Sequence, residues 1–351
     1  MTELLAEQRQ ELLLRELRAT GAVRVAQLAA RFGVSAGTIR RDLSELAELG
    51  RLTKVRGGAI PAPTPAPAAD GPARTIGLLV PSATYYYPSV LAGVRAVAAR
   101  RGARVVIALT DYGGSREPAQ IDELRSSGAD GLLVATAGGH HPPTATLTAL
   151  RATGRPFVLL ERQPEDAYEP CEFVLSDHRQ GAHHAVTHLR DLGHRRVALY
   201  LADSPTAPLV REGHAAAVRR LALDPTAPVL DAGRPAPGSA EAGRQYDAFL
   251  DHCLDTGTRA ALVHSDHDAI ELLQRARTRG LRTPEDLALI AYDDEIAALA
   301  ETPLTAVAPP KRQLGEQAAE LLLDRLDAEE ALPLRQVVLH PVLTIRRSCG
   351  A

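Results

Sequence analysis

The chain has no tryptophan, and aromatic residues make up only 3% of its 351 residues. It contains three cysteines, Cys171, Cys253 and Cys349, which have neither the spacing of a metal site nor the even number of a disulfide framework. This cysteine usage predicts a protein of a reducing compartment. Arginine is far more common than lysine, and we interpret this bias as the codon usage of a GC-rich genome rather than as function.

The sequence also lacks the signals of export and membrane insertion. No apolar run approaches the roughly 20 residues that a membrane-spanning helix needs, and the charged N-terminus has no apolar signal core. We therefore expect a cytoplasmic protein without a membrane partner.

Negative charge is unevenly distributed along the chain, whose net charge is −3. Residues 1–60 contain ten Arg or Lys and seven Asp or Glu, a net charge of +3, which leaves −6 for the remainder. A basic N-terminal part attached to an acidic remainder indicates that contact with DNA is confined to one end of the molecule.

That basic part carries a helix-turn-helix pattern. A leucine-rich helix ends near Gly21, and a short helix follows before a turn into Ser35, a residue suited to cap the next helix. Ile39, Leu43 and Leu46 recur at helical spacing and are expected to face a core, which directs the opposite face toward solvent. Arginines on that face can pair with phosphates or read guanine edges in the major groove. The residues expected to contact DNA along this helix are Ser35, Gly37, Thr38, Arg40, Arg41 and Ser44.

Residues 51–60 alternate and then turn on a glycine pair, as a small β-wing would, and Arg56 is a further expected DNA contact. The whole segment resembles the DeoR family of bacterial repressors, whose wing usually has His where Arg56 stands. The matching positions are Arg9, Leu13, Leu17, Ser35, Thr38, Ile39, Arg40, Arg41, Asp42 and Leu43. The resemblance implies a winged helix-turn-helix domain over residues 1–60 that binds operator DNA.

Residues 61–73 are rich in proline and alanine, which predicts an extended linker. From residue 74 onward, short apolar strands alternate with helices in two successive series, as in an α/β protein with doubly wound parallel sheets. Expected strands include 75–80, 103–109, 131–134, 156–160, 196–201, 260–264 and 287–292, and expected helices include 88–101, 117–127, 180–192, 210–221 and 268–279.

Residues 74–347 resemble the LacI/GalR type of sensor, which is related to periplasmic sugar-binding proteins. The resemblance rests on runs that occur in the family's order: 76–81, 130–133, 192–197, 280–287, 292–294, 303–305, 314–326 and 342–347. It implies a periplasmic-binding-protein-like (type I) sensor over residues 74–351 with two lobes. The expected first lobe comprises about 74–161 and 294–325, and the second about 162–293 and 326–347.

Ligands of open α/β sheets bind beyond the carboxyl ends of the strands. Asp293 directly follows one expected strand, and Glu161 and Arg162 directly follow another. In the resembled family these positions hold sugar hydroxyls or purine edges, through the two acceptors of a carboxylate and the donor fork of a guanidinium. For Asp293 the alternative is a structural carboxylate at the end of a strand.

Four further effector contacts are implied by the resemblance. Tyr86 and Tyr87 match aromatic positions that stack on a ring, although plain packing remains an alternative for both. Ser265 stands where the family usually has Asn, and Arg211 lies beside Val210, which replaces the usual Arg.

Metal and enzyme sites are not expected. His184 and His188 are four residues apart, but a zinc site needs three or four converging ligands. The run 264–268 contains Ser, His and Asp, yet adjacent residues cannot converge as a hydrolytic triad. The Gly113–Gly114 pair is too short for a phosphate loop. We expect no catalytic residue and no cofactor.

Together these features predict a homodimeric transcriptional repressor whose operator binding is controlled by a small polar effector, a sugar or nucleoside. One alternative is a regulator that senses a phosphorylated sugar, and another is a sugar-acting enzyme with a DNA-binding arm.

Overall fold

The structure is a computed structural model that describes residues 9–10, 12–14, 17, 23–48, 52–55, 58–61, 73–110, 114–233, 235 and 238–351. It forms two compact units, Met1–Pro67 and Ala68–Ala351. Most of the predicted linker (62–72) lies outside the described residues, as does Arg56 of the expected DNA face. No described helix is long and apolar enough to cross a membrane.

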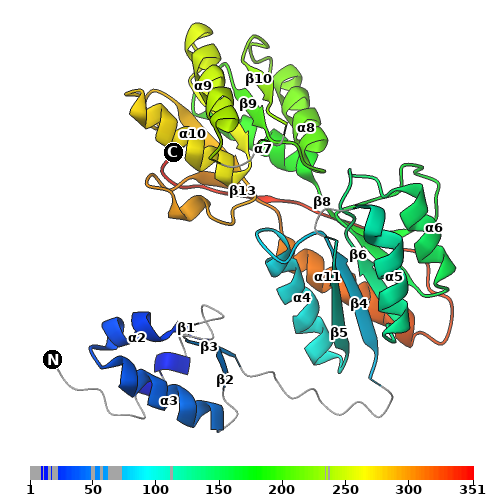
Figure 1. Cartoon of the computed structure of the whole chain (residues 1–351). Helices are drawn as coiled ribbons and strands as arrows, with labels where there is room; N and C mark the ends of the chain where they lie inside the picture. The colour runs from blue at the N-terminus through cyan, green and yellow to red at the C-terminus, as the bar shows by residue number, and fades with distance from the viewer. Residues whose placement is uncertain are drawn as a thin grey trace. The chain divides into compact units, whose positions relative to one another are not determined.

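The N-terminal unit is a small helical core with a three-stranded antiparallel sheet (Figure 1). Its elements are β1 (Val23–Arg24), α2 (Val25–Phe32), α3 (Ala36–Glu48), β2 (Leu52–Val55) and β3 (Gly58–Pro61), with strand order β1-β3-β2. Ile39, Leu43 and Leu46 of α3 are buried together with Leu13 and Leu17, as their spacing predicts. Burial of this apolar face fixes the opposite face of α3 toward solvent.

A buried ion pair joins the start of this unit to α3. The guanidinium of Arg9 donates from Nε to Asp42 Oδ2 at 2.6 Å and from Nη2 to Asp42 Oδ1 at 2.9 Å. Such a two-pronged pair is directional as well as strong, so it restricts how α3 can rotate about its axis.

The first lobe of the second unit is an all-parallel sheet with order β14-β8-β7-β6-β4-β5. Helices α4 and α11 cover one face of this sheet, and α5 and α6 cover the other. Because both faces are buried, its central strands read as continuous apolar runs. The strands are β4 (Thr75–Val80), β5 (Arg104–Leu109), β6 (Gly131–Val134), β7 (Phe157–Leu160), β8 (Glu172–Ser176) and β14 (Gln336–Leu339). The helices are α4 (Tyr87–Arg100), α5 (Glu117–Ser126), α6 (Thr144–Ala152) and α11 (Lys311–Asp327).

The second lobe has the sheet order β10-β9-β11-β12-β13-β15, parallel except for the last pair. Helices α7 and α8 cover one face, and α9 and α10 cover the other. The strands are β9 (Ala198–Leu201), β10 (Val229–Asp231), β11 (Ala260–His264), β12 (Ala288–Tyr292), β13 (Thr305–Ala308) and β15 (Val342–Thr344). The helices are α7 (His178–Asp191), α8 (Ala207–Arg220), α9 (Ala240–Asp255) and α10 (Asp266–Thr278).

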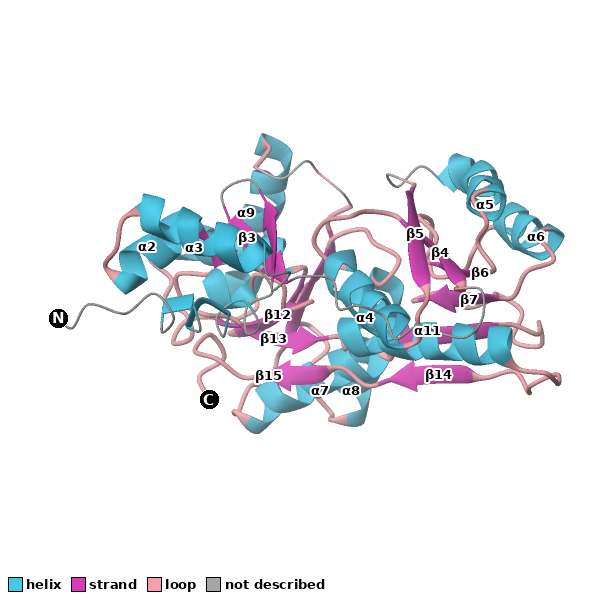
Figure 2. Cartoon of the chain, turned by 90° about the horizontal axis from the view of Figure 1, so that it is seen from below, coloured by secondary structure: helices cyan, strands magenta, loops and turns pink. Residues whose placement is uncertain are grey.

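The chain passes between the two lobes three times, near Asp177, at Pro309–Pro310 and at His340–Pro341. Figure 2 shows the last passage, where β14 and β15 follow each other along the edges of their sheets. The first and last passages are hydrogen-bonded, since Asp177 N donates to Leu339 O at 2.8 Å. All three lie at the carboxyl ends of the parallel strands that lead into them, so these ends of the two sheets face each other.

The expected lobe boundaries are wrong in detail. Residues 162–176 and 326–339 belong to the first lobe, because the buried strand β8 pairs with β7 and with β14. Residues 294–308 belong to the second lobe, because β13 pairs with β12. We expected the first crossing between the lobes at Glu161 and Arg162, directly after β7. The chain instead forms one more buried strand, β8, before it leaves the first sheet.

Helix α11 returns from the far end of the chain to lie against α4 (Figure 1). The helices approach closely at two glycines. A Cβ at Gly315 would lie 2.1 Å from Val90 O, and one at Gly93 would lie 2.0 Å from Arg312 O. Both obstacles are backbone atoms, so side-chain movement cannot relieve the clash.

Gly315→Ala should therefore destabilise the sensor unit by about 1–3 kcal/mol through overpacking, although Ala is the better helix former. Gln317→Ala, on the exposed side of α11, serves as the control and should leave the free energy of unfolding nearly unchanged. Denaturant unfolding of the full chain measures both. A stabilised Gly315→Ala variant would show that the two helices are farther apart than described.

Asp42→Ala should destabilise the N-terminal unit by about 3–5 kcal/mol, because it leaves the guanidinium of Arg9 buried without its carboxylate. The paired substitution Arg9→Met with Asp42→Leu should recover much of this loss, since it removes both charges. Differential scanning calorimetry of the full chain is the measurement. If the single and paired variants unfold alike, the ion pair does not hold α3.

Candidate DNA-binding and effector sites

The exposed face of α3 carries the candidate DNA contacts. Ser35 caps the helix, as predicted, because its hydroxyl accepts from Thr38 N at 3.0 Å. Gly37, Arg40 and Arg41 are exposed, and the guanidinium groups of the two arginines have no partner among the described residues. The half-buried Ser44 donates to Arg40 O at 2.8 Å. The face therefore presents two uncommitted cations one residue apart on a rigid helix.

The two lobes meet directly at the carboxyl ends of their sheets, where polar side chains from each lobe contact one another. We call this set the interlobe junction; it comprises Tyr85, Glu161 and Lys311 of the first lobe and His178, Asp293 and Glu295 of the second. Tyr85 Oη donates to Asp293 Oδ2 at 3.2 Å. Glu161 Oε2 lies 3.5 Å from His178 Nε2, and Lys311 Nζ lies 2.7 Å from Glu295 Oε1.

Glu161 is the most heavily hydrogen-bonded carboxylate of the junction. It accepts from Ser176 N at 2.8 Å, from Ser176 Oγ at 2.7 Å and from the hydroxyl of Tyr86. Burial alone would raise the pKa of Glu161, but the hydrogen bond and charge of His178 and the hydrogen bond of Tyr86 lower it to about 2. This carboxylate is therefore ionised at neutral pH, and its protein partners fix its orientation.

Asp293 lies at the start of a loop that a second carboxylate holds in place. Asp266, at the start of α10, accepts from the backbone N–H groups of Asp294, Glu295 and Ile296 at 3.2, 2.6 and 2.9 Å. Burial raises the pKa of Asp266 to about 6, although these three hydrogen bonds oppose the shift. Asp266 thus positions the loop, which leaves Asp293 to face the first lobe.

A buried lysine of the first lobe also contacts the second lobe at the junction. Lys311, at the first position of α11, is 5% exposed and donates to the carbonyl of Asp293 as well as pairing with Glu295. Its ammonium also lies 5.2 Å from the centroid of the Tyr86 ring, within the range of a cation–π contact. Lys311 therefore links the ring of Tyr86 to the backbone of Asp293, and both of these residues were predicted to contact the effector.

The other four predicted effector residues differ in their contacts, and not all of them lie near the junction. Arg162 donates to the carbonyls of Thr136 and Glu161 at 2.7 and 2.8 Å. Tyr87 is 7% exposed and packs in the core of the first lobe. Ser265 caps α10, where its hydroxyl donates to Asp268 at 3.0 Å. Arg211 lies on α8 and pairs with Asp231 at the edge strand β10. The structure thus joins Tyr86, Glu161 and Asp293 through the junction, but Arg211 takes no part in it.

Sequence reasoning missed Tyr85, His178, Glu295 and Lys311 of the junction. Tyr85 belongs to the same tyrosine run as Tyr86, and its ring lies 4.9 Å from that of His267 in the second lobe. Two of these residues could have been found from their positions rather than from their residue types. Tyr85 comes shortly after β4, and Lys311 directly follows the two prolines where the chain crosses between the lobes.

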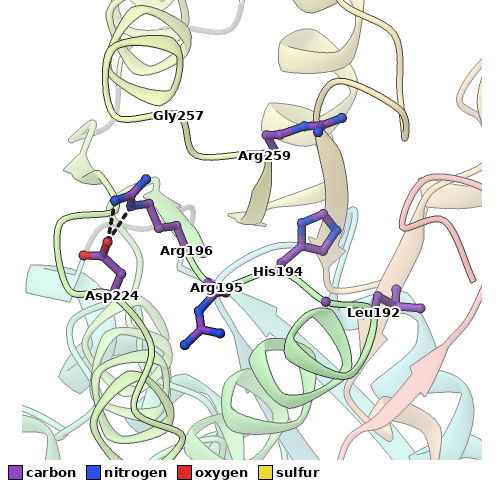
Figure 3. A pocket seen from close by; sticks show the side chains of 8 residues that line it. Leu192, His194, Arg195, Arg196, Asp224, Gly257 and Arg259 are labelled. Carbon is purple, nitrogen blue, oxygen red and sulfur yellow. Dashed lines mark hydrogen bonds and ion pairs between the residues drawn. The ribbon is translucent and has the colours of Figure 1, made fainter.

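Two cavities in the described part of the chain lie elsewhere. The larger, about 550 Å³, is lined by Leu192, Gly193, His194, Arg195, Arg196, Asp224, Gly257 and Arg259, at the amino ends of β9 and β11. Figure 3 shows that Arg196 pairs with Asp224 and that the side chains of Arg195 and Arg259 point in different directions. The second cavity, about 300 Å³, lies between α10 and the segment 280–283. Neither contains a predicted effector residue.

Histidine groupings form no metal centre in the described chain, where no three His, Cys, Asp or Glu side chains could hold an ion. His184 contacts Gln180, and the ring of His141 lies 5.0 Å from that of His140.

Comparisons with known proteins match both units. A family model described as a DeoR-like helix-turn-helix domain matches residues 9–63, and one described as a periplasmic binding protein-like domain matches residues 186–349. The arabinose metabolism transcriptional repressor of Geobacillus stearothermophilus is 26% identical over 327 residues, which cover 92% of this chain and 89% of that protein. An uncharacterized HTH-type transcriptional regulator in the aml 5′ region of Streptomyces limosus is 30% identical over 280 residues, 78% of each chain.

Among solved structures, the chain is similar to a LacI family transcriptional regulator from Enterococcus faecium with bound ribose. The TM-score is 0.63 at 25% identity, and the match covers 78% of this chain and 98% of that one. These relatives are regulators rather than enzymes, which confirms the class expected from the sequence. The chain belongs to the LacI/GalR type of transcriptional regulators, with a DeoR-like helix-turn-helix as its DNA-binding domain.

Proposed function

We propose that the chain is a cytoplasmic, homodimeric repressor whose operator binding is controlled by an unphosphorylated sugar or nucleoside bound at the interlobe junction. The observation that carries this proposal is that one chain contains both an exposed helix face with two arginines and a two-lobed sensor. The polar residues of the sensor converge where the lobes meet. Two relatives support the effector class: one is named for arabinose metabolism, and the other holds ribose.

The DNA contacts of this proposal are the exposed positions of α3, its cap Ser35 with Thr38, and Arg56 of the wing. Two such helices, one from each protomer, would enter successive major grooves, which is the physical reason for a dimer. The net charge of +3 over residues 1–60 favours approach to the phosphate backbone. The boundary between a domain over 1–60 and a sensor over 74–351 belongs to the same proposal.

The charges at the junction favour an unphosphorylated effector over a phosphorylated one. Glu161, Asp293 and Glu295 supply three carboxylates, and the nearby cations Lys311 and Arg162 have protein acceptors, except at Arg162 Nε, which has none among the described residues. Lys311 is bound by Glu295 and the Asp293 carbonyl, and Arg162 gives both terminal nitrogens to backbone carbonyls. A phosphate would meet excess negative charge there, whereas hydroxyl groups can donate to the free acceptor positions of carboxylates.

Arg40→Ala and Arg41→Ala should each weaken operator binding by about 1–3 kcal/mol where the arginine reads a base, and should relax specificity at that base pair. An arginine that contacts only phosphate should weaken binding to all sequences and reduce the salt slope by about one. The operator can be located by footprinting the DNA that flanks the chain's own gene. Fluorescence anisotropy with Arg125→Ala as the control measures affinity; unchanged binding by the double variant would remove α3 as the recognition helix.

Asp293→Ala should weaken effector binding about 10- to 100-fold, because a hydrogen bond to a charged group contributes about 1.5–3 kcal/mol. Operator affinity without effector should stay the same, and Asp293→Asn should have a smaller effect. Calorimetric titration with L-arabinose, D-ribose, cytidine and ribose 5-phosphate tests the effector class, with Asp122→Ala as the control.

If Asp293→Ala lowers the melting temperature and both binding activities equally, Asp293 is a structural carboxylate. If ribose 5-phosphate binds better than D-ribose, the phosphorylated alternative holds.

A further inference from the structure

His264 is the last residue of β11 and lies directly before Ser265, the predicted effector residue whose hydroxyl is taken up by the cap of α10. Side chains at 260 and 262 of this strand pack in the apolar cluster shared with α7 and α8. Because side chains alternate along a strand, His264 projects toward the same face, at the end where α7 begins.

The imidazole of His264 borders the interlobe junction. Its ring centroid lies 5.5 Å from that of Tyr292, whose hydroxyl is 3.1 Å from His178 Nδ1. His178 in turn contacts Glu161 of the first lobe. His264 is thus separated from the contact between the lobes by two side chains, and Asp293 follows Tyr292 directly.

His264 is 4% exposed, and its Nδ1 has no hydrogen-bond partner in the described part of the chain. Buried polar atoms without a partner are costly, so each one calls for a physical explanation. Burial lowers the pKa of His264, which keeps the ring neutral. A neutral imidazole can donate with one nitrogen and accept with the other, which suits a hydroxyl group.

His214 is a buried histidine of the same lobe whose ring has a hydrogen-bond partner. It is also 4% exposed, but its Nε2 lies 2.8 Å from the carbonyl of Val197, within the core beneath α8. The two histidines share residue type, burial and lobe, and they differ in position and in whether the ring has a partner.

We propose that His264 is a further effector-contacting residue, whose Nδ1 forms a hydrogen bond with a hydroxyl group of the ligand. The inference rests on the proposed function, and it adds that the ligand reaches past Asp293 toward the start of α7. It assigns a polyhydroxylated ligand, because the neutral ring complements a hydroxyl better than a phosphate or carboxylate.

The test compares the same two substitutions at both histidines in the full chain. The amide of Asn reaches the position of Nδ1, whereas that of Gln reaches the position of Nε2. Calorimetric titration with L-arabinose, D-ribose and cytidine gives Kd, and thermal unfolding without ligand gives Tm. We expect His264→Asn to keep Kd within about threefold and His264→Gln to weaken it about tenfold or more, since a lost hydrogen bond costs on the order of that factor.

At the control position, His214→Gln should retain Tm and His214→Asn should lower it, and both should keep the Kd of the unsubstituted protein. If both His264 variants bind as the unsubstituted protein does while their Tm falls, the ring serves stability and the inference is wrong, although the proposed function stands. If His264→Gln keeps Kd while His264→Asn weakens it, the assignment of the hydrogen bond to Nδ1 is also wrong. If none of the three compounds binds the unsubstituted protein, the proposed effector class fails and the inference fails with it.

Discussion

The meeting of the two sheets at their carboxyl ends is the constraint on which the sensor depends. The chain crosses between the lobes three times on this side, so the loops after β4, β7 and β12 are brought together although they are distant in sequence. Side-chain contacts then join the lobes, among them Tyr85 with Asp293, Glu161 with His178 and Lys311 with Glu295. Any ligand that competes for these groups must change how the lobes contact each other. Under the proposed function, that dependence couples effector chemistry to the arrangement of the lobes.

The N-terminal unit follows a similar logic on a smaller scale. Its apolar core buries one face of α3, and the two-pronged pair of Arg9 with Asp42 restricts the rotation of the helix. The proposed recognition of DNA by the exposed arginines depends on this firm attachment of the buried side of the same helix. Basic charge is concentrated in this unit, while the acidic sensor contributes little attraction for DNA.

Much of the fold could be predicted from the sequence, because local patterns determine it. The recognition helix follows from the spacing of Ile39, Leu43 and Leu46, and the central strands follow from apolar runs that are buried on both faces. The lobe boundaries could not be predicted, because β8 and β13 join their sheets through partners that no local pattern specifies. Of the junction residues, Glu161 and Asp293 were singled out because both directly follow strands, and their contact with an effector stays a prediction. Tyr85 was missed because its partner lies 208 positions away in the chain, and Ser265 was assigned without its role as a helix cap.

We expect a sugar-like effector to bind at the interlobe junction and not in the larger cavity on the far side of the second lobe. Hydrogen–deuterium exchange of the full chain, with and without saturating L-arabinose or D-ribose, tests it directly. Binding at the junction should slow exchange in segments 81–87, 161–163 and 292–296. Protection confined to 192–196 and 257–259, around the 550 Å³ cavity, would contradict it.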